Sequence, residues 1–87
     1  EVNMFTKIQA MINENNMLLA QAYAKVAERL GSDDDDELKE IAALLKINEI
    51  VLMELKEKPS FLNEKTVLNS LTDMHKAILT TIIELDN

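Results

Sequence analysis

The stretch from Ser32 to Pro59, SDDDDELKEIAALLKINEIVLMELKEKP, decides the fold of this 87-residue chain. It opens with a serine and a run of acids, continues with hydrophobic residues three and four positions apart, and ends on a proline. Acidic side chains stabilise the positive end of a helix dipole, and the residue before a proline disfavours the helical conformation. The pattern therefore predicts a helix over about 34–58 that ends just before Pro59.

The apolar residues of this helix fall on two faces. The main stripe contains Leu38, Ile41, Leu44, Leu45, Val51, Leu52 and Leu55. A second patch lies on the far side and consists of Ala43, Ile47, Ile50 and Met53. A helix that is apolar on two faces packs against more than one neighbour. In one interpretation, this middle helix contacts both other helices at once. In the other, the far-side patch faces another copy of the chain, and its four residues are then the predicted interface of a homodimer.

A long amphipathic segment, about 3–30, precedes the middle helix. At about 100° per residue, its apolar residues share one face. They are Met4, Ile8, Met11, Ile12, Leu18, Leu19, Ala22, Tyr23, Val26 and Leu30. Gly31 is suited to stop this helix. Asn13, Asn15 and Asn16 are poor helix formers within one turn, so the helix is either continuous or broken there.

The third segment follows Pro59 and is predicted to be helical over about 61–85. Ser60 or Asn63 would cap its start, because both side chains can accept hydrogen bonds from free backbone amides. Its stripe contains Val67, Leu68, Leu71, Met74, Ile78, Leu79, Ile82 and Leu85. Both connections are short, so consecutive helices should be antiparallel. We therefore expect an all-α fold, a single domain over 1–87 that forms an antiparallel up–down–up three-helix bundle and self-associates through its middle helix.

One polar residue interrupts the middle of each apolar stripe. These residues are Asn15, Asn48 and His75, and hairpins folded at the two connections set them at similar heights. Leaving a buried amide without a partner costs about 1–3 kcal/mol, so these side chains should bond one another, a backbone carbonyl or a trapped water. We interpret them as a buried polar layer that selects the packing register.

An acidic cap cluster stands at the start of the middle helix. It consists of Ser32, Asp33, Asp34, Asp35, Asp36 and Glu37. The side chain of Ser32 or of Asp33 can accept hydrogen bonds from the free backbone amides of the first helical turn. A calcium loop of the EF-hand type needs a glycine at its sixth position, which here is Leu38 when counted from Asp33. We therefore assign the cluster to capping and not to metal binding.

The composition argues against enzyme activity and against metal, nucleic-acid and membrane binding. The chain has no cysteine, one glycine and one histidine, which leaves no thiolate metal site and no glycine-rich phosphate loop. Sixteen acidic and nine basic residues give a net charge of −7, which repels nucleic acid and anionic membranes and favours basic partners. We expect no enzyme activity, no metal or other cofactor, and no direct contact with nucleic acid or membrane.

These features favour a non-enzymatic protein–protein interaction module of the cytoplasm, such as an adaptor, a small chaperone, an inhibitor or an assembly subunit, which docks by apolar helix faces. Its partner would be a protein, and a basic one if the acidic surface steers it. One alternative is an acidic regulator that binds a nucleic-acid-binding protein in place of DNA, suggested by the acidic cap cluster. The other is a histidine phosphotransfer domain that uses His75, which the apolar residues around this histidine disfavour.

Overall fold

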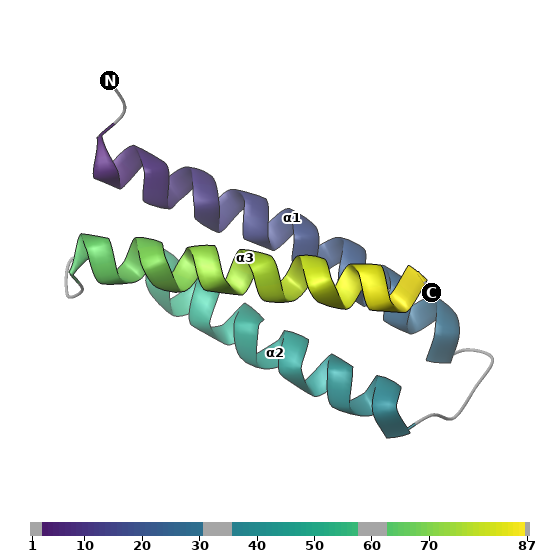
Figure 1. Ribbon diagram of the computed structural model, residues 1–87. Helices are drawn as coiled ribbons and strands as arrows, with labels where there is room; N and C mark the ends of the chain where they lie inside the picture. Colours follow the sequence, from purple (N-terminus) through teal and green to yellow (C-terminus); the bar gives the residue numbers. More distant parts are fainter. Residues whose placement is uncertain (1–2, 31–35, 58–62, 87) are drawn as a thin grey trace.

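The structure, a computed structural model, describes residues 3–30, 36–57 and 63–86 and is all-α over these ranges (Figure 1). Helix α1 spans Met4–Leu30, α2 spans Asp36–Glu57 and α3 spans Glu64–Asp86. They run up, down and up, and form an elongated bundle with principal extents of 46 × 23 × 15 Å. The sequence prediction of an all-α three-helix bundle is confirmed.

Asparagine side chains cap two of the helices. The Oδ1 atom of Asn3 accepts from the backbone amide of Thr6 at 2.8 Å, and the Oδ1 atom of Asn63 accepts from that of Thr66 at 3.1 Å. Both bonds satisfy amides that have no partner inside the first turn of a helix. Asn63 is one of the two predicted caps of the third helix. The other, Ser60, lies outside the described residues, as do the predicted helix ends at 34–35, 58 and 61–62 and the stop at Gly31.

Helix α1 continues without a break through its three neighbouring asparagines. Asn13 and Asn16 are exposed there, whereas Asn15 is buried. Helix α1 packs against both other helices, and tertiary packing of this kind outweighs a locally weak helix propensity. The interpretation in which this helix is continuous is therefore correct.

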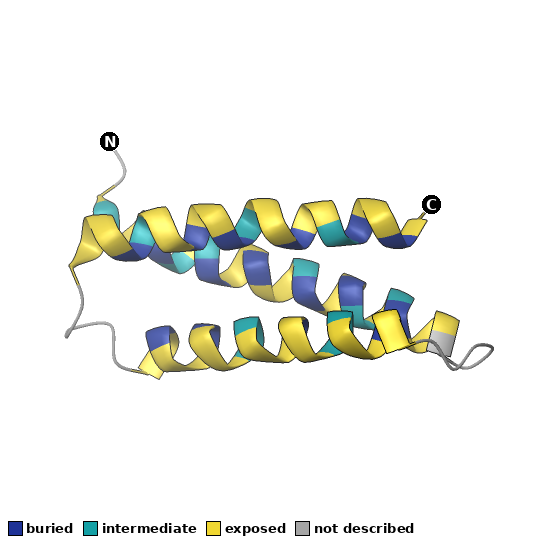
Figure 2. Cartoon of the chain, turned by 60° about the horizontal axis from the view of Figure 1, so that its bottom comes forward, coloured by how far each residue is buried: buried dark blue, intermediate teal, exposed yellow. Residues whose placement is uncertain are grey.

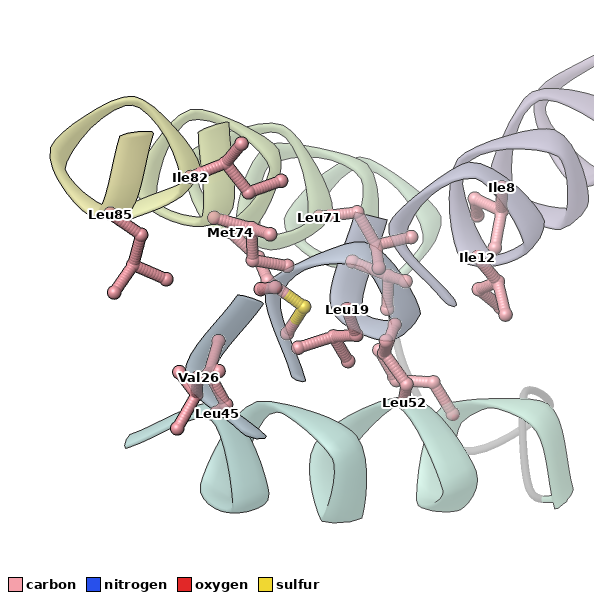
Figure 3. Packing of buried hydrophobic residues seen from close by; sticks show 14 of the residues in the cluster. Ile8, Ile12, Leu19, Val26, Leu45, Leu52, Leu71, Met74, Ile82 and Leu85 are labelled. Atoms are coloured by element: carbon pink, nitrogen blue, oxygen red, sulfur yellow. The ribbon is translucent and has the colours of Figure 1, made fainter. Parts of the chain in front are cut away.

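The three helices enclose one hydrophobic core. Its buried members are Ile8, Ile12, Leu19, Ala22, Val26, Leu38, Leu45, Leu52, Leu55, Val67, Leu71, Met74, Ile78, Ile82 and Leu85. Figure 2 shows the buried residues as a stripe along each helix, and Figure 3 shows side chains of all three helices extending into the space between them. Burying one large aliphatic side chain stabilises a fold by about 1.5–3 kcal/mol, so these stripes hold the bundle together.

Helix α1 is the element that the other two share. It packs extensively against both α2 and α3, whereas α2 and α3 touch each other much less. Figure 2 shows α3 and α2 on opposite sides of the bundle, with α1 running between them. The two-faced sequence pattern pointed to the middle helix as the shared element. The structure gives that place to α1 and leaves the second face of α2 uncovered.

Three residues predicted for the apolar stripes, Leu44, Val51 and Leu79, are exposed rather than buried. Leu44 is the clearest case, with 61% of its surface exposed. Helical periodicity places these residues on an apolar arc, but a neighbouring helix covers only part of that arc. Since α2 and α3 make little contact with each other, Leu44 stays uncovered.

Among the described residues, no helix combines the length and the apolar character that a membrane span requires.

Candidate interaction surface

The second apolar patch of α2 lies at the surface of the bundle. We call it the outer strip, and it consists of Ala43, Ile47, Ile50 and Met53. All four residues are exposed, and Ile47 has 57% of its surface exposed. Spacings of four and three residues align most of the strip along one side of the helix. Around the helix, Lys39 and Lys46 lie between Ile50 and Met53, whereas Glu40 lies beside Ile47 and Glu54 stands at the C-terminal end of the strip. The strip therefore has both signs of charge against it.

A groove separates α2 from α3. We call it the α2–α3 groove; its lining residues are Ile41, Leu44, Leu45, Ile47, Asn48, Ala77 and Thr81, and its volume is about 270 Å³. Leu45 is buried at its base, whereas Leu44 and Ile47 are exposed. Sequence reasoning did not single out Ala77 or Thr81. A single alanine or threonine beside an apolar stripe carries no signal until the neighbouring helix is placed.

Acidic side chains edge this groove along both helices. They are Glu40, Glu54, Asp73 and Glu84, and all four are exposed. Each stands four or seven residues from Leu44, Ile47 or Ala77, which places it on the same helical arc as a lining residue. Lys39, Lys46, Lys65 and Lys76 lie about 80° or more around their helices from the lining residues. Lys56 shares the arc of Leu45, but it stands eleven residues further along α2. The groove therefore has an apolar lining and an acidic edge.

Asn15 of α1 is fully buried, on the side of the helix that faces α3. Among the described residues, it is the one polar side chain in the buried core. Its Nδ2 atom donates to the backbone carbonyl of Leu71 at 3.1 Å. Its Oδ1 atom has no hydrogen-bond partner among the described residues. The bond joins two helices that are 56 residues apart in sequence, so Asn15 fixes their relative height while leaving one acceptor unpaired.

The other two residues of the predicted polar layer lie at the margins of the core. Asn48 is half-buried and lines the α2–α3 groove. His75 is also half-buried, and its Nε2 atom lies 3.1 Å from Oε1 of Glu14 on α1. No hydrogen bond within the described ranges joins two of the three layer residues. The structure thus buries Asn15 and places Asn48 and His75 at the edges of two different helix pairs.

The surroundings of His75 bear on the phosphotransfer interpretation. The ring is not enclosed as the sequence pattern suggested, since 24% of its side-chain surface is exposed. However, the carboxylate of Glu14 stands beside Nε2. A phosphoryl group at that nitrogen would meet this like charge, which disfavours its attachment.

A tyrosine–glutamate pair connects α1 to α2. The hydroxyl of Tyr23 donates to Oε2 of Glu49 at 3.0 Å, and Lys46 lies 3.5 Å from the same oxygen. Burial raises the pKa of Tyr23 from its ordinary 10.0 to about 12, and the hydrogen bond and the negative charge of Glu49 add to this increase. The phenol therefore stays neutral at physiological pH and acts as a hydrogen-bond donor between the helices.

The acidic cap cluster lies only partly within the described residues. Asp36 and Glu37 begin α2 and are exposed, while the rest of the acidic cap cluster, 32–35, lies outside the described residues. Over the described ranges, no group of three or more histidine, aspartate or glutamate side chains is placed to hold a metal ion.

No family model, no curated protein and no solved structure matches the chain. Any function must therefore be argued from the surfaces described above.

Proposed function

We propose that this protein is a non-enzymatic protein–protein interaction module, of the adaptor, small chaperone, inhibitor or assembly-subunit kind, which docks through apolar faces of α2. The observation that carries the proposal is the number of large hydrophobic residues that α2 exposes. They are Leu44, Ile47, Ile50, Val51 and Met53. Isolated exposed hydrophobic residues are ordinary, but a group of this size on one 22-residue helix is typical of an interaction surface.

The occupant that we propose for the outer strip is a second copy of the chain. A chain with a net charge of −7 repels its own copies unless the contact surface contains basic residues as well. The outer strip has Lys39 and Lys46 on its Met53 side and Glu40 on its Ile47 side. If two α2 helices pair side by side about a two-fold axis along their length, the basic edge of each faces the acidic edge of the other. The pairing would thus combine apolar burial with opposite charges.

We further propose that the module works in the cytoplasm, where the lack of cysteine in its sequence fits a reducing compartment.

Sedimentation velocity over about a hundredfold range of concentration tests the proposal, because self-association depends on concentration. We expect a monomer–dimer equilibrium for the natural chain and a monomer at all these concentrations for Ile50→Lys. Ile83→Lys is the matched control, since Ile83 is equally apolar and is exposed on α3, away from the outer strip. It should leave the dimer intact.

A natural chain that stays monomeric throughout this range would overturn the homodimer. A dimer that Ile83→Lys disrupts and Ile50→Lys leaves unchanged would place the contact on α3, and would overturn the assignment to α2. Circular dichroism of each variant establishes that the helices have formed before its oligomeric state is read.

A further inference from the structure

The α2–α3 groove has the form of a vacant helix position. Leu44 and Ile47 line it on α2, and Val51 follows one turn beyond them. Their spacings of three and four residues are the seam pattern of helices that pack side by side. All three are exposed. The opposite wall presents Ala77 and Thr81, whose short side chains allow a close backbone approach. A helix laid between these walls would pair with both α2 and α3 and turn three helices into four.

The charges around the groove specify the kind of helix that fits. Glu40 and Glu54 stand near the two ends of the α2 wall, and Asp73 and Glu84 stand on the α3 wall. The lysines of both helices lie on other faces except Lys56, which shares the arc of Leu45 but stands eleven residues beyond it. Complementary charge selects partners and speeds their encounter, whereas like charges placed together reject them. A second copy of the groove face would set acid against acid, so this surface differs from the outer strip in what it can accept.

The half-buried Asn48 adds a polar point to the lining. Its side chain makes no hydrogen bond with any other described residue, and it lies among Ile41, Leu44 and Leu45. A polar side chain on the incoming helix at this height would pair with the amide of Asn48. Such a pair within an apolar seam fixes the register of the two helices.

From this geometry we propose that the α2–α3 groove binds a basic amphipathic helix of another protein, with apolar residues in a heptad pattern and lysine or arginine at both sides. The span from Glu40 to Glu54 is 14 residues, or about 21 Å, so about four helical turns of the partner would be engaged. This inference rests on the proposed function, that of an interaction module, and names the class of partner for one of its surfaces.

Designed peptides test the proposal directly on the full chain. One peptide carries a leucine heptad stripe flanked by lysine and arginine, a second carries the same stripe flanked by glutamate, and a third has the basic composition with the stripe scrambled. We expect calorimetry to show binding of the first peptide, weakening as salt is added, and at least tenfold weaker binding of the other two.

Substitutions in the chain test whether the peptide binds in the α2–α3 groove. Ala77→Phe fills the groove from an exposed position, and Glu40→Lys with Glu84→Lys reverses two edge charges. Each should weaken binding of the basic peptide by at least tenfold, and the double charge reversal should also remove most of the salt dependence. Ile83→Lys is the matched control and should leave the affinity unchanged. Circular dichroism shows whether each variant is folded.

The outcomes separate this inference from the proposed function. If the basic peptide fails to bind while Ile50→Lys still dissociates the dimer, the groove proposal is overturned and the interaction module stands. Equal binding of the acidic and basic peptides would refute the charge argument, and dissociation of the dimer by Leu44→Glu but not by Ile50→Lys would make the occupant a second copy. Binding that requires the stripe and the basic flanks, and that Ala77→Phe blocks, supports the proposal.

Discussion

Asn15 shows how one buried polar group shapes the packing of this bundle. Its amide nitrogen bonds to the carbonyl of Leu71, but its Oδ1 atom is buried without a partner among the described residues. The Leu71 carbonyl lies within α3 and can also accept from the backbone amide four residues later. Losing the side-chain bond therefore leaves that carbonyl satisfied, whereas keeping Asn15 retains an unpaired acceptor.

We expect Asn15→Leu to raise the free energy of unfolding by about 1 kcal/mol, because an apolar side chain of similar size removes the unpaired oxygen. Asn15→Ala is the control and should lower the free energy of unfolding by about 1–3 kcal/mol, since it removes the same oxygen but leaves a cavity. Urea denaturation followed by circular dichroism measures both. A loss of stability in Asn15→Leu would show that the bond to Leu71 outweighs the cost of the unpaired oxygen.

Tyr23 gives a second measurable consequence of burial, because it is the single tyrosine of a chain without tryptophan. Its ultraviolet absorbance therefore reports one phenol. We expect this phenol to ionise near pH 12 instead of 10.0. Glu49→Gln should lower the midpoint by removing the negative charge, but not to the ordinary value, since burial is the largest cause of the increase. A midpoint near 10 in the natural chain would show that the phenol is not held against Glu49.

The same pKa difference makes stability depend on pH. The folded state holds the phenolic proton more tightly than the unfolded chain, so this contribution to stability is complete below pH 10 and is lost as pH rises toward 12. Lysines also lose charge in this range, so the informative quantity is the difference from Tyr23→Phe. The variant should show the smaller fall in free energy of unfolding between these two pH values.

At the level of the helices, the sequence predicted which segments are helical and how they follow one another, but not how much of each apolar arc is covered. Periodicity and proline placement suffice for α2, because they are local properties of the chain. Leu38, Leu45 and Leu52, at heptad spacing, are all buried as their stripe predicts. Leu44 lies on the same arc and is exposed, because its burial depends on how far α3 stands from α2.

The candidate interaction surface was likewise predictable only in part from the sequence. The outer strip was visible in the sequence as a second apolar face, since Ile47 and Ile50 stand well away from the main stripe. The α2–α3 groove was not visible, because it exists only once the two helices are placed and Ala77 comes to lie opposite Leu44. The polar layer was argued from position in the stripe alone. Stripe position located Asn15 in the core, yet it could not indicate that the partner of His75 is Glu14 on the polar side of α1.

For the molecule as a whole, the central position of α1 implies an order of local stability. An element that is packed on two sides opens only when both contacts are lost, whereas one packed on a single side opens at lower cost. Helix α1 contacts both neighbours, while α2 packs less extensively against α1 than α3 does and hardly touches α3. We therefore expect α1 to be the last element to open and α2 to be the first.

Native-state hydrogen exchange measures this order. In dilute Ile50→Lys, where we expect a monomer, amides between Ile12 and Val26 should exchange at least tenfold more slowly than those between Asp36 and Leu45, a ratio that corresponds to about 1.4 kcal/mol. In the natural chain at high concentration, dimerisation through the outer strip should slow exchange in α2 and change α1 little. Equal protection of α1 and α2 in the monomer would mean that the bundle opens as one unit. The exposed face of α2 would then be a fully ordered surface before any partner arrives, with no part of the binding free energy used to fold it.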